Sequence, residues 1–304
     1  MATFEPILLK NSRNFRKMIK KLTHQNRSTS EDIRAVFQIS YAVEAELLQA
    51  TDFPPLKRPL EAFTNSDNQF FGYYLKDRFP GSKLAVAEAL QCPTLLNNGF
   101  GDHRIEGIGD KHVPWIHDCK NTDVVIGVDD EAAVRLLRLF NEASGRDCLA
   151  HYGVDSDFVN QLDLLGISGI GNVIAAIKFA KYYELTEDDY VVTILTDSME
   201  LYGSRVEELA ADRGEYTNID AHKDVQLLMD SGIENMLELT HYEKKRVHNL
   251  KYFTWIEQQG RELDELNEQW YDHDAYWNNI FSLAPQIDEL IVEFNLQIDA
   301  AEFF

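Results

Sequence analysis

The fold is decided by residues 164–195, LLGISGIGNVIAAIKFAKYYELTEDDYVVTIL, in which a long apolar run is followed by a short one. The first run, from Asn172 to Tyr183, is long enough for a helix and follows several glycines. The second, from Tyr190 to Leu195, is rich in β-branched residues and is typical of a buried strand. A helix followed closely by a buried strand is the repeating unit of α/β proteins, so this stretch predicts part of a parallel sheet.

The same alternation continues upstream. Apolar runs at Lys83–Ala89 and Asp123–Val128 predict two more buried strands, and Gln69–Arg78 and Glu131–Ala143 predict helices beside them. Strands separated by helices of this length imply right-handed crossovers and a sheet that helices cover on both faces. We therefore predict an α/β fold class: a partial parallel sheet with flanking helices, plus helical N- and C-terminal segments.

Helices without strands are predicted on either side of this region. Ile33–Ala50 repeats its apolar residues with a helical period, and prolines end that helix soon afterwards. Beyond about Gly214 we expect the strands to stop and three helices to follow, at Thr240–Gly260, Arg261–Trp270 and Ile287–Ile298. The predicted division is a basic helical segment at 1–59, an α/β domain at 60–214 and a helical extension at 215–304.

Charge is unevenly distributed along the chain. The formal net charge of −22 repels nucleic acid and anionic lipid over most of the surface, which argues against a nucleic-acid binder. Residues 1–27, however, hold seven basic residues and one acid, Glu5. Such a stretch is a solvated helix face, a contact for an acidic partner or an organelle transit peptide. We expect a cytoplasmic protein, with the organelle matrix as the alternative.

Neither a membrane span, a disulfide framework nor a metal site is indicated. No run reaches the roughly 18 apolar residues that a membrane-spanning helix needs. The three cysteines are far apart and form no C-x-x-C, which favours a reducing compartment. His241, His248 and the run Asp272–Asp274 match no standard ligand spacing, so we expect no metal.

Ordered motifs between Gly81 and Ser204 resemble those of one enzyme family. GSKLAVAEAL (81–90) is similar to its AVEP-type strand ending, and HRIEGIGDKHVPWI (103–116) to its IQGIGAGFVP-type turn. LLGISG (164–169) resembles its GISSG helix start, and TDSMELYGS (196–204) its PSGGERY loop. By these motifs, residues 69–204 resemble the C-terminal half of pyridoxal-phosphate (PLP) enzymes of the cysteine synthase type, which have fold type II and belong to the tryptophan synthase β superfamily. Residues 241–270 resemble an extension in a cysteine synthase-like branch of PLP-dependent lyases.

The resemblance implies a set of residues that face the cofactor. They are Asp197 with Ser198 beside it, as partner of the pyridine nitrogen, and Gly107, Gly109, Ser168 and Gly169, as walls of the site. Each has a plainer explanation. Asp197 and Ser198 would cap the helix that begins near Tyr202, and tight turns need glycine whatever the cofactor. We therefore treat them as vestigial candidates.

Two parts of a PLP site are not found in the sequence. The Schiff-base lysine belongs to the family's first half, in a run of the type N-P-T-G-S-F-K, and no such run occurs here. The family's phosphate loop, G-T-G-G-T, falls on Phe63–Asp67, where all three glycines are replaced. We therefore expect the lysine-bearing half to be absent. We expect no catalytic residue and no bound cofactor for this chain alone, PLP being implied by the resemblance.

Three hypotheses of function follow. The first is a degenerate, non-catalytic derivative, a pseudoenzyme that acts as a structural or regulatory subunit. The second is a PLP-dependent lyase, for β-elimination or replacement on serine-like or cysteine-like amino acids, completed by a separate chain with the lysine half. The third is a binding module with a small-molecule pocket near Gly107 and Ser168. A protein partner or a homo-oligomer is expected, and neither nucleic acid nor a membrane.

Overall fold

The computed structural model describes residues 60–64, 76, 79–193, 195, 197–283, 285–287 and 289–290. For residues 60–64 the description covers the backbone alone. Four predictions lie outside the described residues: the basic stretch at 1–27, the helix at Ile33–Ala50, most of the helix at Gln69–Arg78, and the end of the Ile287–Ile298 helix. The phosphate-loop positions 65–67 lie outside them as well.

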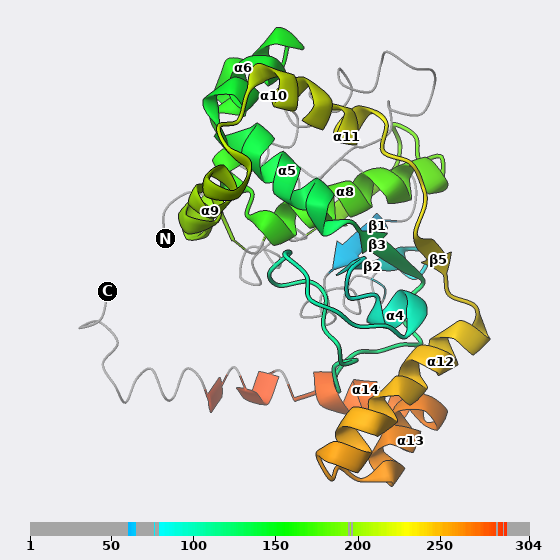
Figure 1. The fold of residues 1–304 in the computed structure, drawn as a ribbon. Helices are drawn as coiled ribbons and strands as arrows, with labels where there is room; N and C mark the ends of the chain where they lie inside the picture. The colour runs from blue at the N-terminus through cyan, green and yellow to red at the C-terminus, as the bar shows by residue number, and fades with distance from the viewer. Residues whose placement is uncertain are drawn as a thin grey trace. The chain divides into compact units, whose positions relative to one another are not determined.

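The described chain alternates strands and helices (Figure 1). The strands are β1 (Leu60–Thr64), β2 (Lys83–Ala89), β3 (Val124–Val128), β4 (Tyr190–Thr193) and β5 (Met236–Glu238). The helices up to β5 are α4 (Thr94–Asn97), α5 (Asp130–Asn141), α6 (Ala143–His151), α7 (Ser156–Val159), α8 (Ile167–Tyr182), α9 (Gly203–Arg213), α10 (Asn218–Asp224) and α11 (Gln226–Met229). After β5 come α12 (His241–Lys251), a π-helix (Tyr252–Gln258), α13 (Leu263–Tyr271) and α14 (His273–Phe281).

The five strands form one sheet in the order β4-β1-β2-β3-β5. β1 runs parallel to both β4 and β2, and β2 runs parallel to β3. β5 pairs with β3 in the antiparallel direction. The predicted α/β class is confirmed, with one change: the sheet is parallel over four strands and mixed at its edge.

Most predicted elements match the observed ones, and one prediction is wrong. β2 has the predicted bounds, β3 begins one residue later than predicted, and α8 begins five residues earlier, at Ile167. Strands do not stop near Gly214, because Met236–Glu238 adds the edge strand β5. A three-residue strand is too short to show a period, and its pairing depends on β3, more than 100 residues away in sequence.

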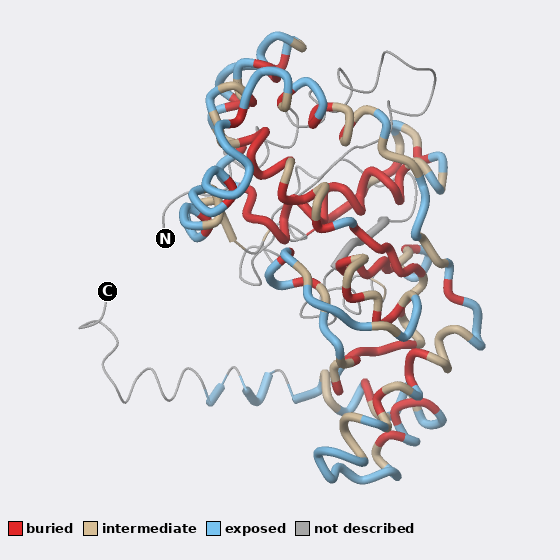
Figure 2. The backbone as a smooth tube through the Cα atoms, viewed as in Figure 1, coloured by how far each residue is buried: buried red, intermediate tan, exposed pale blue. Residues whose placement is uncertain are grey.

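Helix α8 is the centre of the core. It contacts β1, β2, β3, β4 and α5, and nearly all of its residues are buried, as the colours of Figure 2 show. Its one buried lysine, Lys178, donates from Nζ to the carbonyls of Gly127 (3.3 Å) and Glu234 (2.8 Å). The amine thus satisfies carbonyls at the end of β3 and just before β5, so a polar group is buried without an unmet hydrogen bond.

No single described helix is long and apolar enough to cross a membrane. Two helical segments, residues 156–164 and 167–182, meet at 117°. Together they are long and apolar enough to cross a membrane, by length and composition only. All three cysteines are free thiols and are buried.

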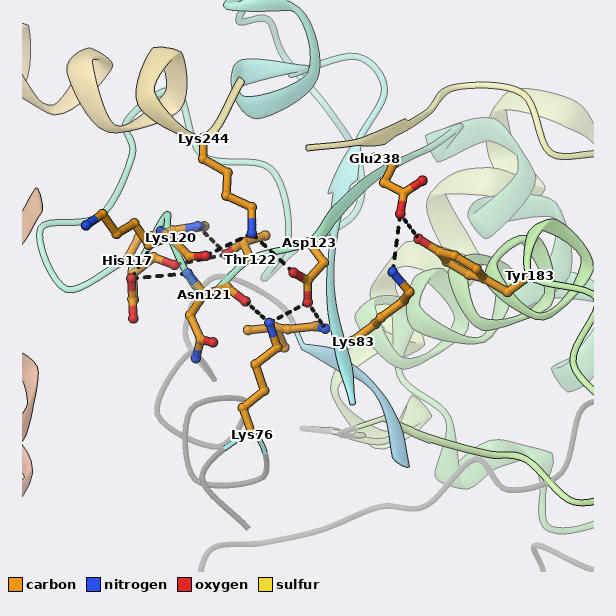
Figure 3. A network of polar contacts seen from close by, with 12 residues as sticks. Lys76, Lys83, His117, Lys120, Asn121, Thr122, Asp123, Tyr183, Glu238 and Lys244 are labelled. Atoms are coloured by element: carbon orange, nitrogen blue, oxygen red, sulfur yellow. Dashed lines mark hydrogen bonds and ion pairs between the residues drawn. The ribbon is translucent and has the colours of Figure 1, made fainter. Parts of the chain in front are cut away.

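A charged network joins the amino ends of β2 and β3 (Figure 3). The carboxylate of Asp123 lies 2.5 Å from Lys76 Nζ and 3.2 Å from Lys244 Nζ, and it accepts the backbone N–H of Leu84 at 2.9 Å. The two amines also donate to the carbonyls of Asn121 (2.6 Å) and Lys120 (2.9 Å). Burial would raise the pKa of Asp123, but Lys76, the Leu84 amide and Lys244 together lower it. The carboxylate therefore stays charged and holds both amines.

The chain divides into two compact units, Met1–Val247 and His248–Phe304. In the second unit the ammonium of Lys251 is fully buried and donates to Gln269 Oε1 at 2.7 Å. Trp270 and Trp277 are buried, whereas Trp255 is half-buried and Phe253 is 56% exposed. The helical extension is thus folded around part of its aromatic set. The predicted boundaries at residues 59 and 214 stay predictions.

Candidate functional site at the carboxyl ends of the strands

The sequence candidates gather at the carboxyl ends of the parallel strands. The loop after β2, the loop after β4 and the start of α8 meet at this edge, because each crossover in a parallel sheet leaves from the same side. This is the usual position of ligand sites in open α/β sheets.

Asp197 lies at the centre of this group. Its Oδ1 accepts a hydrogen bond from Ser168 Oγ at 3.5 Å, its Oδ2 accepts one from the Tyr202 hydroxyl, and its carbonyl accepts one from the Gly166 amide at 3.0 Å. Burial and the Asp197 carboxylate raise the pKa of Tyr202, so the phenol stays protonated and keeps donating. The plainer explanation, that Asp197 caps the following helix, is not what the contacts show, because its carboxylate is held by two hydroxyls.

Ser198 differs from its neighbour. It precedes the 3₁₀ turn Met199–Tyr202, but its side chain does not cap that turn. Its hydroxyl has no hydrogen bond to any described residue, and the residue is half-buried. Of the two sequence candidates for a ring-nitrogen partner, Ser198 is therefore the one with a free donor.

The glycine candidates divide between two places. Gly107 (φ +87°) lies against Ser168, whose Cβ would be 3.5 Å from a Cβ on the glycine. Gly109 (φ +106°) lies against Ala89 and His103, both 3.0 Å from such a Cβ, and Gly169 lies against Leu195. Positive φ and close contact both explain the glycines of the turn without a cofactor. The structure thus brings together Gly107, Ser168 and Asp197, and places Gly109 beside the end of β2.

The sequence analysis did not identify Glu88 as a candidate site residue. A lone acid in the apolar run KLAVAEA was nevertheless a signal by which it could have been found. It is 3% exposed, and its two oxygens accept the amides of Leu95 (2.9 Å) and Leu96 (2.8 Å) at the start of α4. Burial raises the pKa of Glu88 from its usual 4.5 to about 7, against the pull of the two amides and Arg246. Glu88 thus fixes α4 to the end of β2.

Beside Gly109 the loop after β2 lines an open polar pocket. Its volume is about 440 Å³, and it is lined by Cys92, Gly101, Asp102, His103, Gly109, Asp110 and Lys111. Both acids and bases line it, so it selects for no single sign of charge. In the described part of the chain, no three His, Cys, Asp or Glu side chains are placed to hold a metal ion.

Four carboxylates lie at or just after the carboxyl ends of β2, β3 and β4. We define the carboxylate rim as Glu88, Asp129, Asp130 and Asp197. Asp129 accepts the Gln91 amide (2.8 Å) and the Glu131 N–H (3.1 Å), and Asp130 accepts the Arg104 N–H (2.9 Å). None of the four forms an ion pair with a described residue. The four carboxylates of the rim are therefore held by neutral hydrogen-bond donors.

The start of α8 does not fit the PLP phosphate. The start of α8 is the helix N-terminus that lies beside Asp197, and helix N-termini attract anions. There, however, a Cβ on Gly166 would lie 1.9 Å from Asp197 Oδ1, so a carboxylate already occupies that position. A dianionic phosphate would meet this charge at close range.

Comparisons with known proteins agree with the motifs. No family model matches the chain. Cysteine synthase B of Campylobacter jejuni is 30% identical over 131 residues, 43% of this chain and 37% of that protein. Cysteine synthase of Staphylococcus aureus is 27% identical over 131 residues, 43% of this chain and 36% of that protein. The chain thus spans little more than a third of the length of these curated relatives.

Two solved structures show a partial likeness to this chain. A cysteine synthase of Entamoeba histolytica gives a TM-score of 0.45 at 18% identity, covering 69% of this chain and 53% of that one. An O-acetylserine dependent cystathionine beta-synthase of Helicobacter pylori gives 0.38 at 26% identity, covering 53% and 46%. About two fifths of this chain is therefore similar in sequence to cysteine synthases, in the region where the motifs between Gly81 and Ser204 lie.

Proposed function

We propose that this chain is a non-catalytic cysteine synthase-like protein that acts as a structural or regulatory subunit. The carboxylate rim carries the proposal. A PLP enzyme needs a cradle of amides or cations for the phosphate, whereas here the strand ends and the start of α8 present carboxylates held by neutral donors. The replaced glycines at Phe63–Asp67 support the same conclusion from the sequence.

A second candidate is a lyase whose PLP site is completed by a separate chain. Two observations favour it: the hydroxyl of Ser198 has no hydrogen bond within the described residues, and Gly107 stays packed against Ser168 as in a site wall. When bound, PLP would supply the electron sink for chemistry at an amino acid. In this candidate Ser198 would orient the ring, and the lysine would come from the other chain.

The test is whether the full chain binds PLP. The protein is incubated with PLP, dialysed, reduced with borohydride and mapped by peptide mass spectrometry. We expect a colourless protein and only scattered lysine adducts, and we expect Asp197→Ala to change no visible spectrum. Asp212→Ala, an exposed acid on α9, is the matched control.

Stoichiometric modification of one lysine in the chain alone would overturn the proposal. The second candidate gives a different result: colour that appears only when a chain with the lysine half is added, and that is reduced by Ser198→Ala. Such colour would replace the subunit proposal with the completed enzyme.

A further inference from the structure

Apolar side chains repeat along α14 and the described residues after it, where Ser282 and Leu283 form a turn and residues 285–287 are again helical. Tyr276, Ile280, Leu283, Ile287 and Leu290 are spaced alternately four and three residues apart. Three of them are exposed, Leu283 by 45%, Ile287 by 51% and Leu290 by 64%. Spacing of this kind is the pattern by which one helix anchors to another. Isolated exposed apolar residues need no explanation, but a spaced row of them does.

The row leads into a groove. α13 and α14 contact each other, and a groove of about 520 Å³ is lined by Glu268, Asp272, Ala275, Tyr276, Asn279, Ile280 and Leu283. Its apolar members, Ile280 and Leu283, belong to the row. Its acidic members, Glu268 and Asp272, are exposed, and neither forms an ion pair with a described residue. The groove is therefore lined by both apolar and acidic side chains.

The charge of the surface distinguishes between two occupants of the groove, a second copy of this chain and a basic helix. Residues 248–290 contain nine carboxylates and only two basic side chains, Lys251 and Arg261. Lys251 is fully buried, so the surface around the groove is strongly acidic. A second copy of the same acidic surface would be repelled, because like charges across an interface oppose association. A basic helix is complementary in both shape and charge.

We propose that the groove and the row Ile280–Leu283–Ile287–Leu290 form a docking surface for a basic amphipathic helix of a protein partner. The apolar face of that helix lies against Ile280 and Leu283, and its lysines or arginines lie near Glu268 and Asp272. Apolar contact supplies the affinity, and charge supplies the orientation and the salt dependence.

The test uses the full chain and two synthetic helical peptides. One carries leucines at alternating four- and three-residue spacing with flanking lysines, and the other has glutamates in place of the lysines. Fluorescence anisotropy should detect binding of the lysine peptide, weakening as salt rises, and none of the glutamate peptide. Equal binding of both peptides, or of neither, would overturn the proposal.

Variants locate the surface. Leu283→Asp should weaken binding of the lysine peptide by at least about tenfold, since a carboxylate replaces an apolar anchor. Leu263→Asp is the matched control, because Leu263 is 47% exposed in the same unit but does not line the groove. Asp272→Lys should weaken binding and flatten its salt dependence, with Asp264→Lys as control. Equal losses in control and test variants would place the contact elsewhere. Dimerisation of the chain that Leu283→Asp abolishes would identify a second copy as occupant and overturn the proposal.

Discussion

The two ends of the parallel strands hold their carboxylates in opposite ways. At the amino end, Asp123 is shared by two lysines and an amide, and the network ties β2, β3 and the start of α12 together. At the carboxyl end, Glu88 and Asp197 accept only amides and hydroxyls. An ion pair neutralises a carboxylate, whereas a neutral donor solvates it and leaves the charge in place.

This difference indicates which end of the strands stabilises the fold and which end could have held a ligand. Opposite charges at the amino end compensate one another, so that end needs nothing from solution. The carboxylates of the rim form no ion pair with a described residue, and they lie at the edge where α/β proteins bind ligands. A phosphate dianion is poorly matched to a row of carboxylates, and this is the physical basis of the proposed non-catalytic role.

The largest expected effect is at the amino end. Asp123→Ala leaves two partly buried ammonium groups without their carboxylate and the Leu84 amide without its acceptor. We expect the free energy of unfolding to fall by about 3 kcal/mol, at the low end for a buried pair because the Asp123 side chain keeps 20% of its exposure. Urea denaturation followed by circular dichroism measures the loss.

The exposed ion pair Lys83–Glu238 provides the control for Asp123. Its atoms are 3.2 Å apart, but the side chains are 35% and 49% exposed, so solvent screens the attraction. Glu238→Ala should cost at most about 0.5 kcal/mol. Equal losses for Glu238→Ala and Asp123→Ala would show that sharing a buried carboxylate is not what stabilises this end.

The second effect is a pH dependence at the carboxyl end. Because burial raises the pKa of Glu88 from 4.5 to about 7, the folded state binds the proton more tightly than the unfolded state. The stabilising contribution is fully present below pH 4.5 and is lost as the pH rises through 7. Over that range the stability of the wild type relative to Glu88→Gln should fall by up to about 3 kcal/mol.

Urea denaturation of both proteins between pH 4.5 and 8 measures this difference. Glu88→Gln keeps the shape and cannot ionise, so a constant gap between the two proteins across this range would mean that Glu88 does not titrate there. If the wild type instead became more stable than Glu88→Gln as the pH rose, the charge of the Glu88 carboxylate would be stabilised more strongly than its neutral hydrogen-bond donors imply.

Much of the fold was predictable because its signals are local. Buried strands such as β2 are continuous apolar runs, and α8 is a long apolar helix that precedes a strand, so their positions follow from periodicity. The strand β5 was not predictable, because its pairing is set by β3 across the sheet. The start of α8 was missed by five residues because Ile167–Gly171 contains glycines that usually favour turns, and only burial makes them helical.

The candidate site was half predictable for a similar reason. Family motifs identified Asp197, Ser168 and Gly107, and the structure brings these three together. The partners that decide the chemistry were not visible: which donor holds Asp197, and whether Ser198 is free, depends on side-chain contacts across the loop after β4. Glu88 could have been found from its position as a charge in an apolar strand, but the reason it is tolerated is the start of α4, seven residues away.

The smallest expected effect tests the neutral donors directly. Tyr202→Phe keeps the buried ring and removes one of the two hydroxyls that Asp197 accepts. Hydrogen bonds to a charged group contribute more than neutral ones, so we expect the free energy of unfolding to fall by about 1.5 kcal/mol at pH 7.

Tyr183→Phe is the control, because its hydroxyl donates to the half-exposed Glu238 at 3.0 Å and should matter little. A loss for Tyr202→Phe no larger than for Tyr183→Phe would show that Asp197 does not depend on its hydroxyl donors, and the contrast between the two ends of the sheet would fail at its central residue.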